Sequence, residues 1–317
     1  MEIRATDYHT AGEPFRIVEP GVLDIPGATV AERRERAAAS EDVERTRRLL
    51  CHEPRGHADM YGGFLVPPDD DGADLGVLFW HKDGYSTACG HGTIALGVWA
   101  VESGRVPAPD DGEVDVTIDV PSGRVVARVR CRGGAVESVA FRNVPAYVVA
   151  RTDALDVAFG GASYAFVAAE RRGLRVVPED LPALIVAGRE IKRELDGTDV
   201  ARHPVDDRLS GIYGTVFHEQ IGPLHHRNVA IFADGEVDRS PTGSATSART
   251  ALLVADGLAE GETWRNDSIV GTTFYARAIG EAPGGMLTEV EGTAFRTGEH
   301  RFVLDPRDPL GTGFVLR

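Results

Sequence analysis

The chain has 317 residues, an apolar fraction of 42%, a charged fraction of 26% and a formal net charge of −15. Its length allows two domains of ordinary size, and its composition is typical of a folded globular protein rather than of a disordered one. The negative charge excludes nucleic acid as an expected partner, because binding to phosphates requires a basic surface.

Nothing in the sequence indicates a membrane span, a secretory signal or a disulfide framework. No apolar run approaches the roughly 20 residues that a membrane helix needs. The first residues lack a basic region followed by an apolar core, so no secretory signal is expected. The three cysteines, Cys51, Cys89 and Cys131, show no paired spacing. We therefore expect a protein of the reducing cytoplasm.

Residues 1–121 are predicted to form a first α+β domain. An Ala-, Glu- and Arg-rich run predicts one solvated helix over residues 30–50. The loop after it contains His52 and His57, but no further Cys or His lies at ligand spacing, so no metal site is expected. Strands are expected at residues 3–7, 15–19, 64–67, 75–81 and 114–120.

Residues 122–308 are predicted to form a second α+β domain, because Pro121-Ser122-Gly123 interrupts the strand pattern. An amphipathic helix over residues 181–195 is expected on the outside of its sheet. Residues 309–317 are expected to return to the first domain as a closing strand. The other strands are expected at residues 124–131, 136–143, 146–150, 163–169, 212–219, 227–232, 267–280, 286–292 and 300–305.

Two stretches of the chain resemble each other. Cys89 begins one loop that runs into an apolar helix, and Thr242 begins another. Each lies 15 residues before a glycine, Gly104 or Gly257, that is suited to cap the end of the helix. Matched loop-helix units are typical of a duplicated fold. One unit carries a thiol where the other carries a hydroxyl.

Cys89 is the candidate catalytic residue. It lies at a predicted helix N-terminus beside Gly90 and His91, where the helix end favours the thiolate and lowers the thiol pKa. Cys51 and Cys131 lack such neighbours and are interpreted as structural. A thiolate in this setting can act as a base.

The two helix starts together predict a carboxylate-binding site. If they face each other across a cleft, they present backbone N–H groups of Gly90, His91, Gly243 and Ser244. Such donors also stabilise the charge that develops when a proton leaves the carbon next to the carboxylate. His91 and Asp238 are candidates to hold a substrate ammonium or ring nitrogen. No cofactor is expected, because the chain has no GxGxxG, no phosphate loop and no lysine in a Schiff-base setting.

Over nearly its whole length the chain resembles the proline racemase family, with its diaminopimelate epimerase-like fold. The resemblance rests on HTAGEP at residues 9–14, EPRGH at 53–57, CGHG at 89–92 and DRSPTG at 238–243. It implies an α+β fold of two pseudo-symmetric, strand-rich halves, each wrapped around a central helix, with the active site in the cleft between them. It also implies that the four amides hold the carboxylate and that His91 and Asp238 hold the ring nitrogen.

The chain departs from the racemases of this family at one position. Those enzymes have Cys at both helix starts, whereas this chain has Cys89 and Thr242. A Thr at the second position resembles the trans-3-hydroxy-L-proline dehydratase branch. Because a Thr hydroxyl is too weak an acid to exchange roles with a thiol, two-base inversion should fail or be slow.

Elimination needs only one base. In trans-3-hydroxy-L-proline the hydroxyl lies on the same face as the Cα hydrogen, so Cys89 could take the proton and return it to the departing hydroxyl. The enamine would tautomerise to Δ1-pyrroline-2-carboxylate. The hypothesis is therefore a cofactor-independent hydro-lyase, with Thr242 only bonding to the substrate or filling the opposite face.

Three alternatives stay open at this point. The first is a racemase or epimerase acting on proline or 4-hydroxyproline, and the second is a non-catalytic amino-acid-binding protein. The third is an isomerase of a linear diamino acid, which is disfavoured because no second ammonium site is evident. The expected partner is a small imino acid. A homodimer is compatible with the sequence, which does not determine the oligomeric state.

Overall fold

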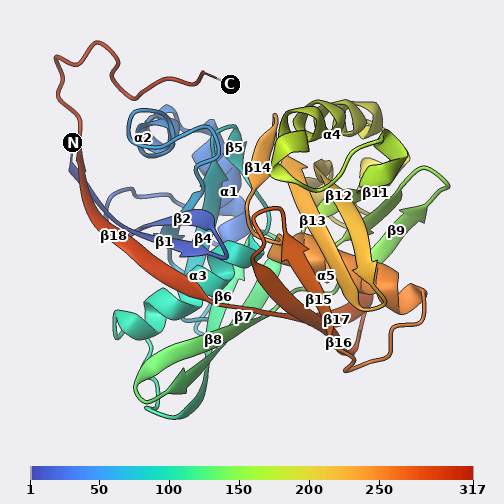
Figure 1. Ribbon diagram of the computed structural model, residues 1–317. Helices are drawn as coiled ribbons and strands as arrows, with labels where there is room; N and C mark the ends of the chain where they lie inside the picture. The colour runs from blue at the N-terminus through green and yellow to red at the C-terminus, as the bar shows by residue number, and fades with distance from the viewer. Residues whose placement is uncertain (1, 317) are drawn as a thin grey trace.

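The structure is a computed structural model that describes residues 2–316, and its strands form two neighbouring halves (Figure 1). No helix in this range is long and apolar enough to cross a membrane. The first part of the chain forms β1 (Glu2–Thr10), β2 (Glu13–Val18), α1 (Val30–Ala39), α2 (Glu41–Cys51), β3 (Gly62–Val66), β4 (Leu75–His81), β5 (Gly84–Tyr85), α3 (Gly90–Glu102), β6 (Gly112–Val120), β7 (Gly123–Arg132) and β8 (Ala135–Arg142).

The remainder of the chain forms β9 (Tyr147–Arg151), β10 (Asp156–Phe159), β11 (Ser163–Ala168), α4 (Leu181–Leu195), β12 (Ile212–Gly222), β13 (His225–Phe232), β14 (Glu236–Asp238), α5 (Gly243–Ala255), β15 (Trp264–Ser268), β16 (Thr273–Ala282), β17 (Gly285–Gly292) and β18 (Ala294–Val303). Short 3₁₀ helices lie at Ala169–Arg172, Pro178–Asp180, Asp199–Ala201 and Asp207–Leu209.

The strands of the two halves pair in the same order. The first half runs β18-β1-β2-β3-β4-β6-β7-β8, and the second runs β9-β10-β11-β12-β13-β15-β16-β17. The parallel pairs β2–β3 and β4–β6 are matched by β11–β12 and β13–β15. The pairing of β8 with β17 joins the halves. The predicted α+β fold of two pseudo-symmetric halves is confirmed.

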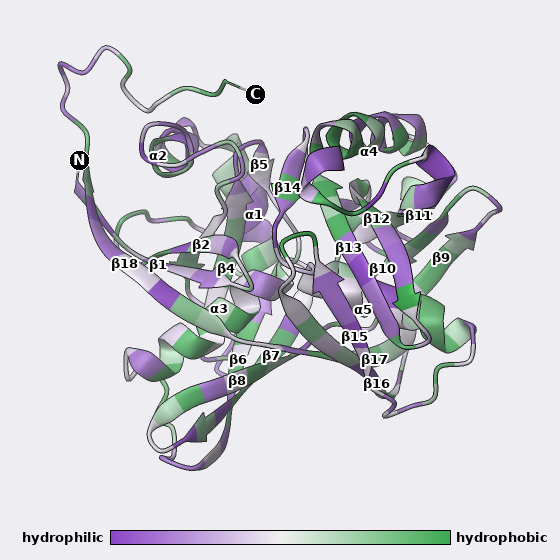
Figure 2. Cartoon of the chain, in the orientation of Figure 1, coloured by the Kyte–Doolittle hydropathy of each residue, from purple (hydrophilic) through white to green (hydrophobic). Residues whose placement is uncertain are grey.

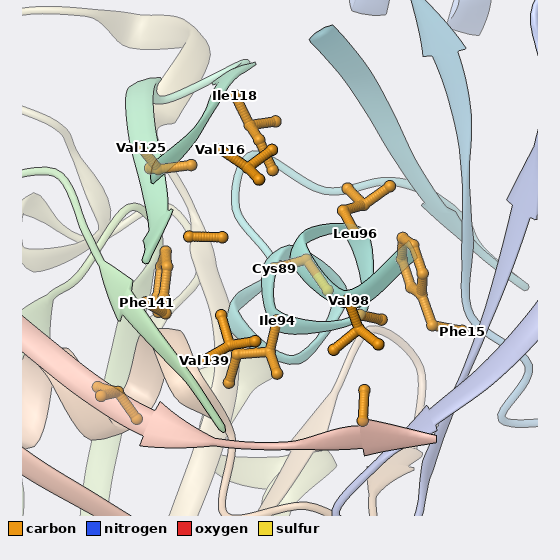
Figure 3. Packing of buried hydrophobic residues seen from close by; sticks show 14 of the residues in the cluster. Phe15, Cys89, Ile94, Leu96, Val98, Val116, Ile118, Val125, Val139 and Phe141 are labelled. Carbon is orange, nitrogen blue, oxygen red and sulfur yellow. The ribbon is translucent and has the colours of Figure 1, made fainter. Parts of the chain in front are cut away.

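Each half has a buried helix that carries one of the two loops singled out in the sequence. The α3 sequence is apolar on all sides, which is typical of a core helix, and the helix is buried from Gly90 to Ala100. It packs against Val116, Val139 and Phe141 of the surrounding strands (Figure 3). In the second half, α5 packs through its small residues against the aromatic side chains of β11. Both helix starts are therefore anchored in hydrophobic cores.

The outer helix α4 has the predicted bounds, 181–195. Figure 2 shows both hydrophilic and hydrophobic residues along this helix, and of the hydrophobic ones Leu184, Ala187 and Ile191 are buried. Close approach to the sheet requires Gly188, because a Cβ there would lie 2.7 Å from the Cβ of Ile231 on β13. This packing places the basic C-terminal part of α4 over the cleft between the halves.

Strands β7 and β8 were expected in the second domain, but they pack on α3 in the same hydrophobic core as β6. The chain then returns to this half through β18, which pairs with β1 over its whole length. We therefore propose that the first half comprises the segments β1–β8 and β18, rather than ending at residue 121.

Three predicted elements differ in the structure. The helix expected over residues 30–50 is broken at Ser40, which ends α1 and begins α2 by accepting a hydrogen bond from the Val43 N–H. The strand expected at 267–280 is two strands, because Gly271 turns the chain with a φ of +82°. The strand expected at 309–317 does not form in the described residues 309–316, where one bridge joins Phe314 to Glu53; β18 crosses back instead.

Candidate active site

The N-termini of α3 and α5 face each other in direct contact. A Cβ placed on Gly90 would lie 2.5 Å from the Cα of Gly243, and a Cβ on Gly243 would lie 2.8 Å from the Cα of Gly90. Any side chain at either position would therefore force the helix ends apart. The contact brings the free backbone N–H groups of both helix starts to one place between the halves.

A small cavity lies at this contact, with a volume of about 10 Å³, which is room for about one water molecule. Predicted site residues line it: Cys89, Gly90, His91, Asp238, Thr242 and Ser244. The remaining lining residues were not predicted: Tyr61, Ala88, Tyr164, Tyr213, Ala230 and Phe232. This volume is smaller than an imino acid, so the structure shows the cavity in a closed state.

Cys89 is buried and forms the N-cap of α3. Its Sγ accepts a hydrogen bond from the Gly92 N–H at 3.2 Å and lies 3.5 and 3.6 Å from the two ring nitrogens of His91. The expected fall in its pKa is wrong for this structure. Burial raises the thiol pKa well above its ordinary value, the charges of Asp238 and Glu13 raise it further, and the Gly92 N–H offsets only part of this.

His91 is a buried, neutral ring between the thiol and a carboxylate. Burial lowers its pKa, and the charge of Asp238 only partly opposes this effect. Its Nδ1 lies 3.9 Å from Asp238 Oδ2. The rings of Tyr61 and Phe15 contact it edge-on, with centroids at 4.9 and 5.8 Å, and fix its orientation.

The loop before α5 is held from both halves. Within it, Asp238 Oδ1 accepts the Ser240 N–H at 2.7 Å. From the first half, buried Glu13 accepts the Arg239 N–H at 2.8 Å, and Asp59 pairs with the Arg239 guanidinium at 3.0 Å. Burial raises the pKa of Glu13 well above its usual value, and the nearby charge of Asp238 raises it further.

Thr242 occupies the position equivalent to Cys89, but its hydroxyl is used differently. Its backbone has a φ of +60°, and its side chain does not cap α5. Its Oγ1 is buried and has no hydrogen-bond partner among residues 2–316. An unpaired buried hydroxyl is costly, so a ligand in the cavity is a natural partner for it. Ser244, next along the helix, is bonded through Oγ to the Tyr164 hydroxyl at 2.7 Å.

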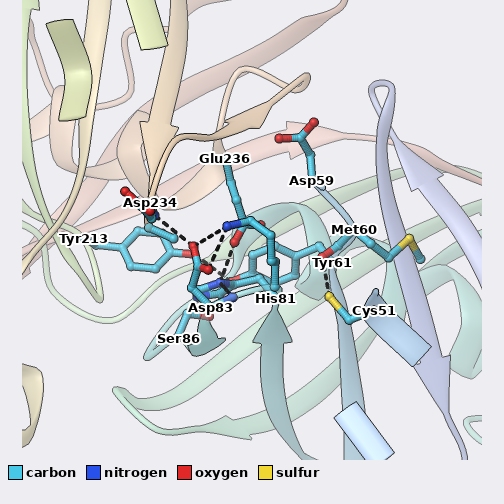
Figure 4. A network of polar contacts seen from close by, with 12 residues as sticks. Cys51, Asp59, Met60, Tyr61, His81, Asp83, Ser86, Tyr213, Asp234 and Glu236 are labelled. Carbon is cyan, nitrogen blue, oxygen red and sulfur yellow. Dashed lines mark hydrogen bonds and ion pairs between the residues drawn. The ribbon is translucent and has the colours of Figure 1, made fainter. Parts of the chain in front are cut away.

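A second polar cluster crosses between the halves near the cavity (Figure 4). His81, Asp83 and Glu236 place possible metal ligands close together. However, Lys82 Nζ already bonds both oxygens of Asp83 at 2.7 and 2.8 Å, and His81 Nδ1 lies 2.9 Å from Glu236 Oε1. Since Lys82 and His81 already bond to these acids, we interpret the cluster as a polar contact between the halves rather than as a metal site.

Comparisons with known proteins agree with this architecture. The proline racemase family model matches residues 5–315. The chain is 42% identical to a trans-3-hydroxy-L-proline dehydratase of Bacillus cereus, across 98% of this chain and 97% of that protein. It is also 42% identical to a 3-hydroxyproline 2-epimerase of Burkholderia multivorans, across 99% and 98%.

Among solved structures, a hydroxyproline epimerase from Agrobacterium vitis with bound trans-4-hydroxy-L-proline matches with a TM-score of 0.90 and 29% identity. The match covers 99% of this chain and 96% of that one. Both the sequence and the fold thus agree over 96–98% of the length of these relatives. The chain belongs to the proline racemase family.

Proposed function

We propose that this protein is a trans-3-hydroxy-L-proline dehydratase that forms Δ1-pyrroline-2-carboxylate with Cys89 as its single base. The observation that carries the proposal is the pairing of one thiol and one hydroxyl, Cys89 and Thr242, across a single cavity between two equivalent helix starts. The similarity to a dehydratase across nearly the whole chain supports the same assignment.

The substrate carboxylate would be held by the N–H groups of Gly90, His91, Gly243 and Ser244. The two helix ends favour negative charge at this point, and each well-placed donor contributes about 2.7–4 kcal/mol to a transition state in which that charge increases. Asp238 would hold the ring ammonium, with neutral His91 beside it. The two ends of the substrate then fix the position of its Cα.

The reaction then needs one base on one face of the ring. The Cys89 thiolate takes the Cα proton, and the electron pair forms the C2–C3 double bond as the C3–O bond breaks. The departing hydroxyl takes the proton back from the thiol and leaves as water. This step returns the thiolate. The resulting enamine then loses a proton from nitrogen and gains one at C3, which gives Δ1-pyrroline-2-carboxylate.

Incubation of the purified protein with trans-3-hydroxy-L-proline, L-proline and trans-4-hydroxy-L-proline tests this function. The pyrroline product should form from the first substrate alone, because only that substrate has a leaving group on the carbon next to Cα. Absence of this product would refute the dehydratase assignment. Inversion of the other two substrates would instead support a racemase or epimerase.

The pH dependence should follow the thiol. Because burial raises the pKa of Cys89, its thiolate fraction grows as pH rises, and kcat/KM should increase between pH 6 and 9 by up to about tenfold per unit. Burial lowers the pKa of His91, which favours its neutral form. A pH–rate profile measures the rise. A plateau that begins below the ordinary thiol pKa of about 8.5 would contradict it.

Thr242→Cys should introduce epimerase activity. The new thiol would lie on the face opposite Cys89 and could supply or remove the second proton, which a Thr hydroxyl cannot. Chiral chromatography of trans-4-hydroxy-L-proline, which has no leaving group on C3, measures this inversion. Thr242→Ser is the matched control and should show none. If Thr242→Cys also shows none, residues beyond this position determine the chemistry of that face.

A further inference from the structure

An open cleft lies between the halves, outside the catalytic cavity. It has a volume of about 490 Å³ and is lined by α1, by the β4–β5 turn and residues after it, by α4 and by residues 208–213. Helices α1 and α4 come from different halves (Figure 1). A cleft of this size is large enough for a small ligand, unlike the closed cavity beneath it.

The cleft is rich in cations although the protein carries a net charge of −15. Three acids line it: Asp83, Asp196 and Asp234. Asp83 pairs with Lys82, and Asp234 pairs with Arg189 at 2.6 Å. Three of its cations form no ion pair within the described range 2–316: Arg34, Lys192 and Arg193. This excess of unpaired positive charge favours an anionic ligand.

Arg34 is the cation that α1 contributes to the lining of this cleft. It is half-buried, and its Nη2 donates to the Tyr85 carbonyl at 3.0 Å. Its Nε is buried and has no partner among residues 2–316. Burial lowers the pKa of this guanidinium, and the charge of Glu35, followed by Tyr61 and Tyr213, partly opposes this effect. The Nε–H of Arg34 can therefore still donate a hydrogen bond to a ligand.

A layer of hydroxyl groups separates Arg34 from the cavity. Tyr213 lines both the cleft and the cavity. The Tyr61 hydroxyl bonds to Ser86 Oγ and lies 3.0 Å from the Tyr213 hydroxyl. The cleft and the cavity thus lie on opposite sides of one layer of hydrogen-bonded hydroxyl groups. A ligand bound at Arg34 would lie against this layer.

We propose that the inner end of this cleft is a carboxylate-binding site centred on Arg34, which receives the imino acid before it passes the hydroxyl layer of Tyr61, Ser86 and Tyr213. The guanidinium fork matches the two oxygens of a carboxylate, and Lys192 and Arg193 add positive charge at the mouth. The identity of the ligand as an imino acid rests on the proposed function, whereas the carboxylate site rests on the cleft itself.

Kinetics of Arg34→Gln test the site in the intact enzyme. We expect kcat/KM for trans-3-hydroxy-L-proline to fall by about tenfold or more, while kcat changes little. The reason is that the site binds the substrate before the chemical step, so its loss slows substrate binding. Arg34→Lys should recover part of this loss. Arg36→Gln is the matched control: it changes the same charge on α1, but on an exposed side chain outside the cleft. A kcat/KM for Arg34→Gln equal to that of Arg36→Gln would overturn the proposal.

A second measurement does not depend on turnover. In a spectrum of ¹⁵N-labelled protein, the Arg34 Nε–H signal can be assigned by its absence in Arg34→Lys. Titration with sodium acetate should shift this signal saturably, while sodium chloride at equal ionic strength should not. An unmoved signal, or an equal shift with chloride, would overturn the site. Should the protein bind acetate here yet dehydrate no imino acid, the proposed function fails and the carboxylate site stands.

Discussion

Replacing Cys89 with Ser should reduce kcat for trans-3-hydroxy-L-proline dehydration by about 10³-fold, because it removes the proposed base. A serine hydroxyl fills the same space and can still accept the Gly92 N–H hydrogen bond, so the start of α3 should keep its geometry. Substrate affinity, measured by calorimetry, should change little because the four amides remain. The loss therefore belongs to the chemical step.

Cys131→Ser is the matched control, since Cys131 is also a buried, free cysteine but lies on β7, away from the cavity. This variant should keep the activity of the unmodified protein. If Cys89→Ser retained full activity, the thiol would not be the base. If the unmodified protein bound imino acids but transformed none of them, the alternative of a non-catalytic binding protein would be favoured.

Asp238→Asn should lower kcat/KM by about 150- to 5,000-fold, because removing one partner of a buried ion pair costs about 3–5 kcal/mol. The amide oxygen can still accept the Ser240 N–H, so the loop before α5 should keep its shape. The ring ammonium carries the same charge before and during proton removal. A rise in KM should therefore account for more of the loss than a fall in kcat.

Asp110→Asn makes the same chemical change at an exposed position and should leave both constants unchanged. Steady-state kinetics of the two variants, together with their melting temperatures, separate substrate binding from folding. An Asp238→Asn enzyme with an unchanged KM would show that this carboxylate does not hold the substrate nitrogen.

Most of the fold could be predicted because its elements carry local signals. The period of apolar residues in 181–195 defines α4. The matched loop-helix stretches at Cys89 and Thr242 indicate a duplication, and the strands of the two halves pair in the same order, as β2–β3 and β11–β12 do. Ser40 also carried a signal, since a Ser before an acidic first turn is typical of a helix start. The short strand β10, by contrast, has little pattern of its own and depends on its neighbours.

The candidate site was predictable where it lies in motifs, but not where tertiary contacts build it. The sequence places Cys89 at a helix start, yet it does not show how deeply the thiol is buried, and burial reverses the expected shift of its pKa. Tyr61, Tyr213 and Phe232 reach the cavity from three different strands or loops, so no spacing in the sequence connects them. Arg34 belongs to a run that was predicted to be a solvated helix face, and only the packing of the two halves places it in the cleft.

The central claim, one-base elimination, is tested most directly by incubating the protein with trans-3-hydroxy-L-proline in D2O and following both substrate and product by NMR. The claim predicts Δ1-pyrroline-2-carboxylate labelled with deuterium at C3, where the enamine takes up a solvent deuteron. It also predicts that the remaining substrate keeps its L configuration. Accumulation of a 3-hydroxyproline epimer with deuterium at Cα, without the pyrroline product, would contradict it.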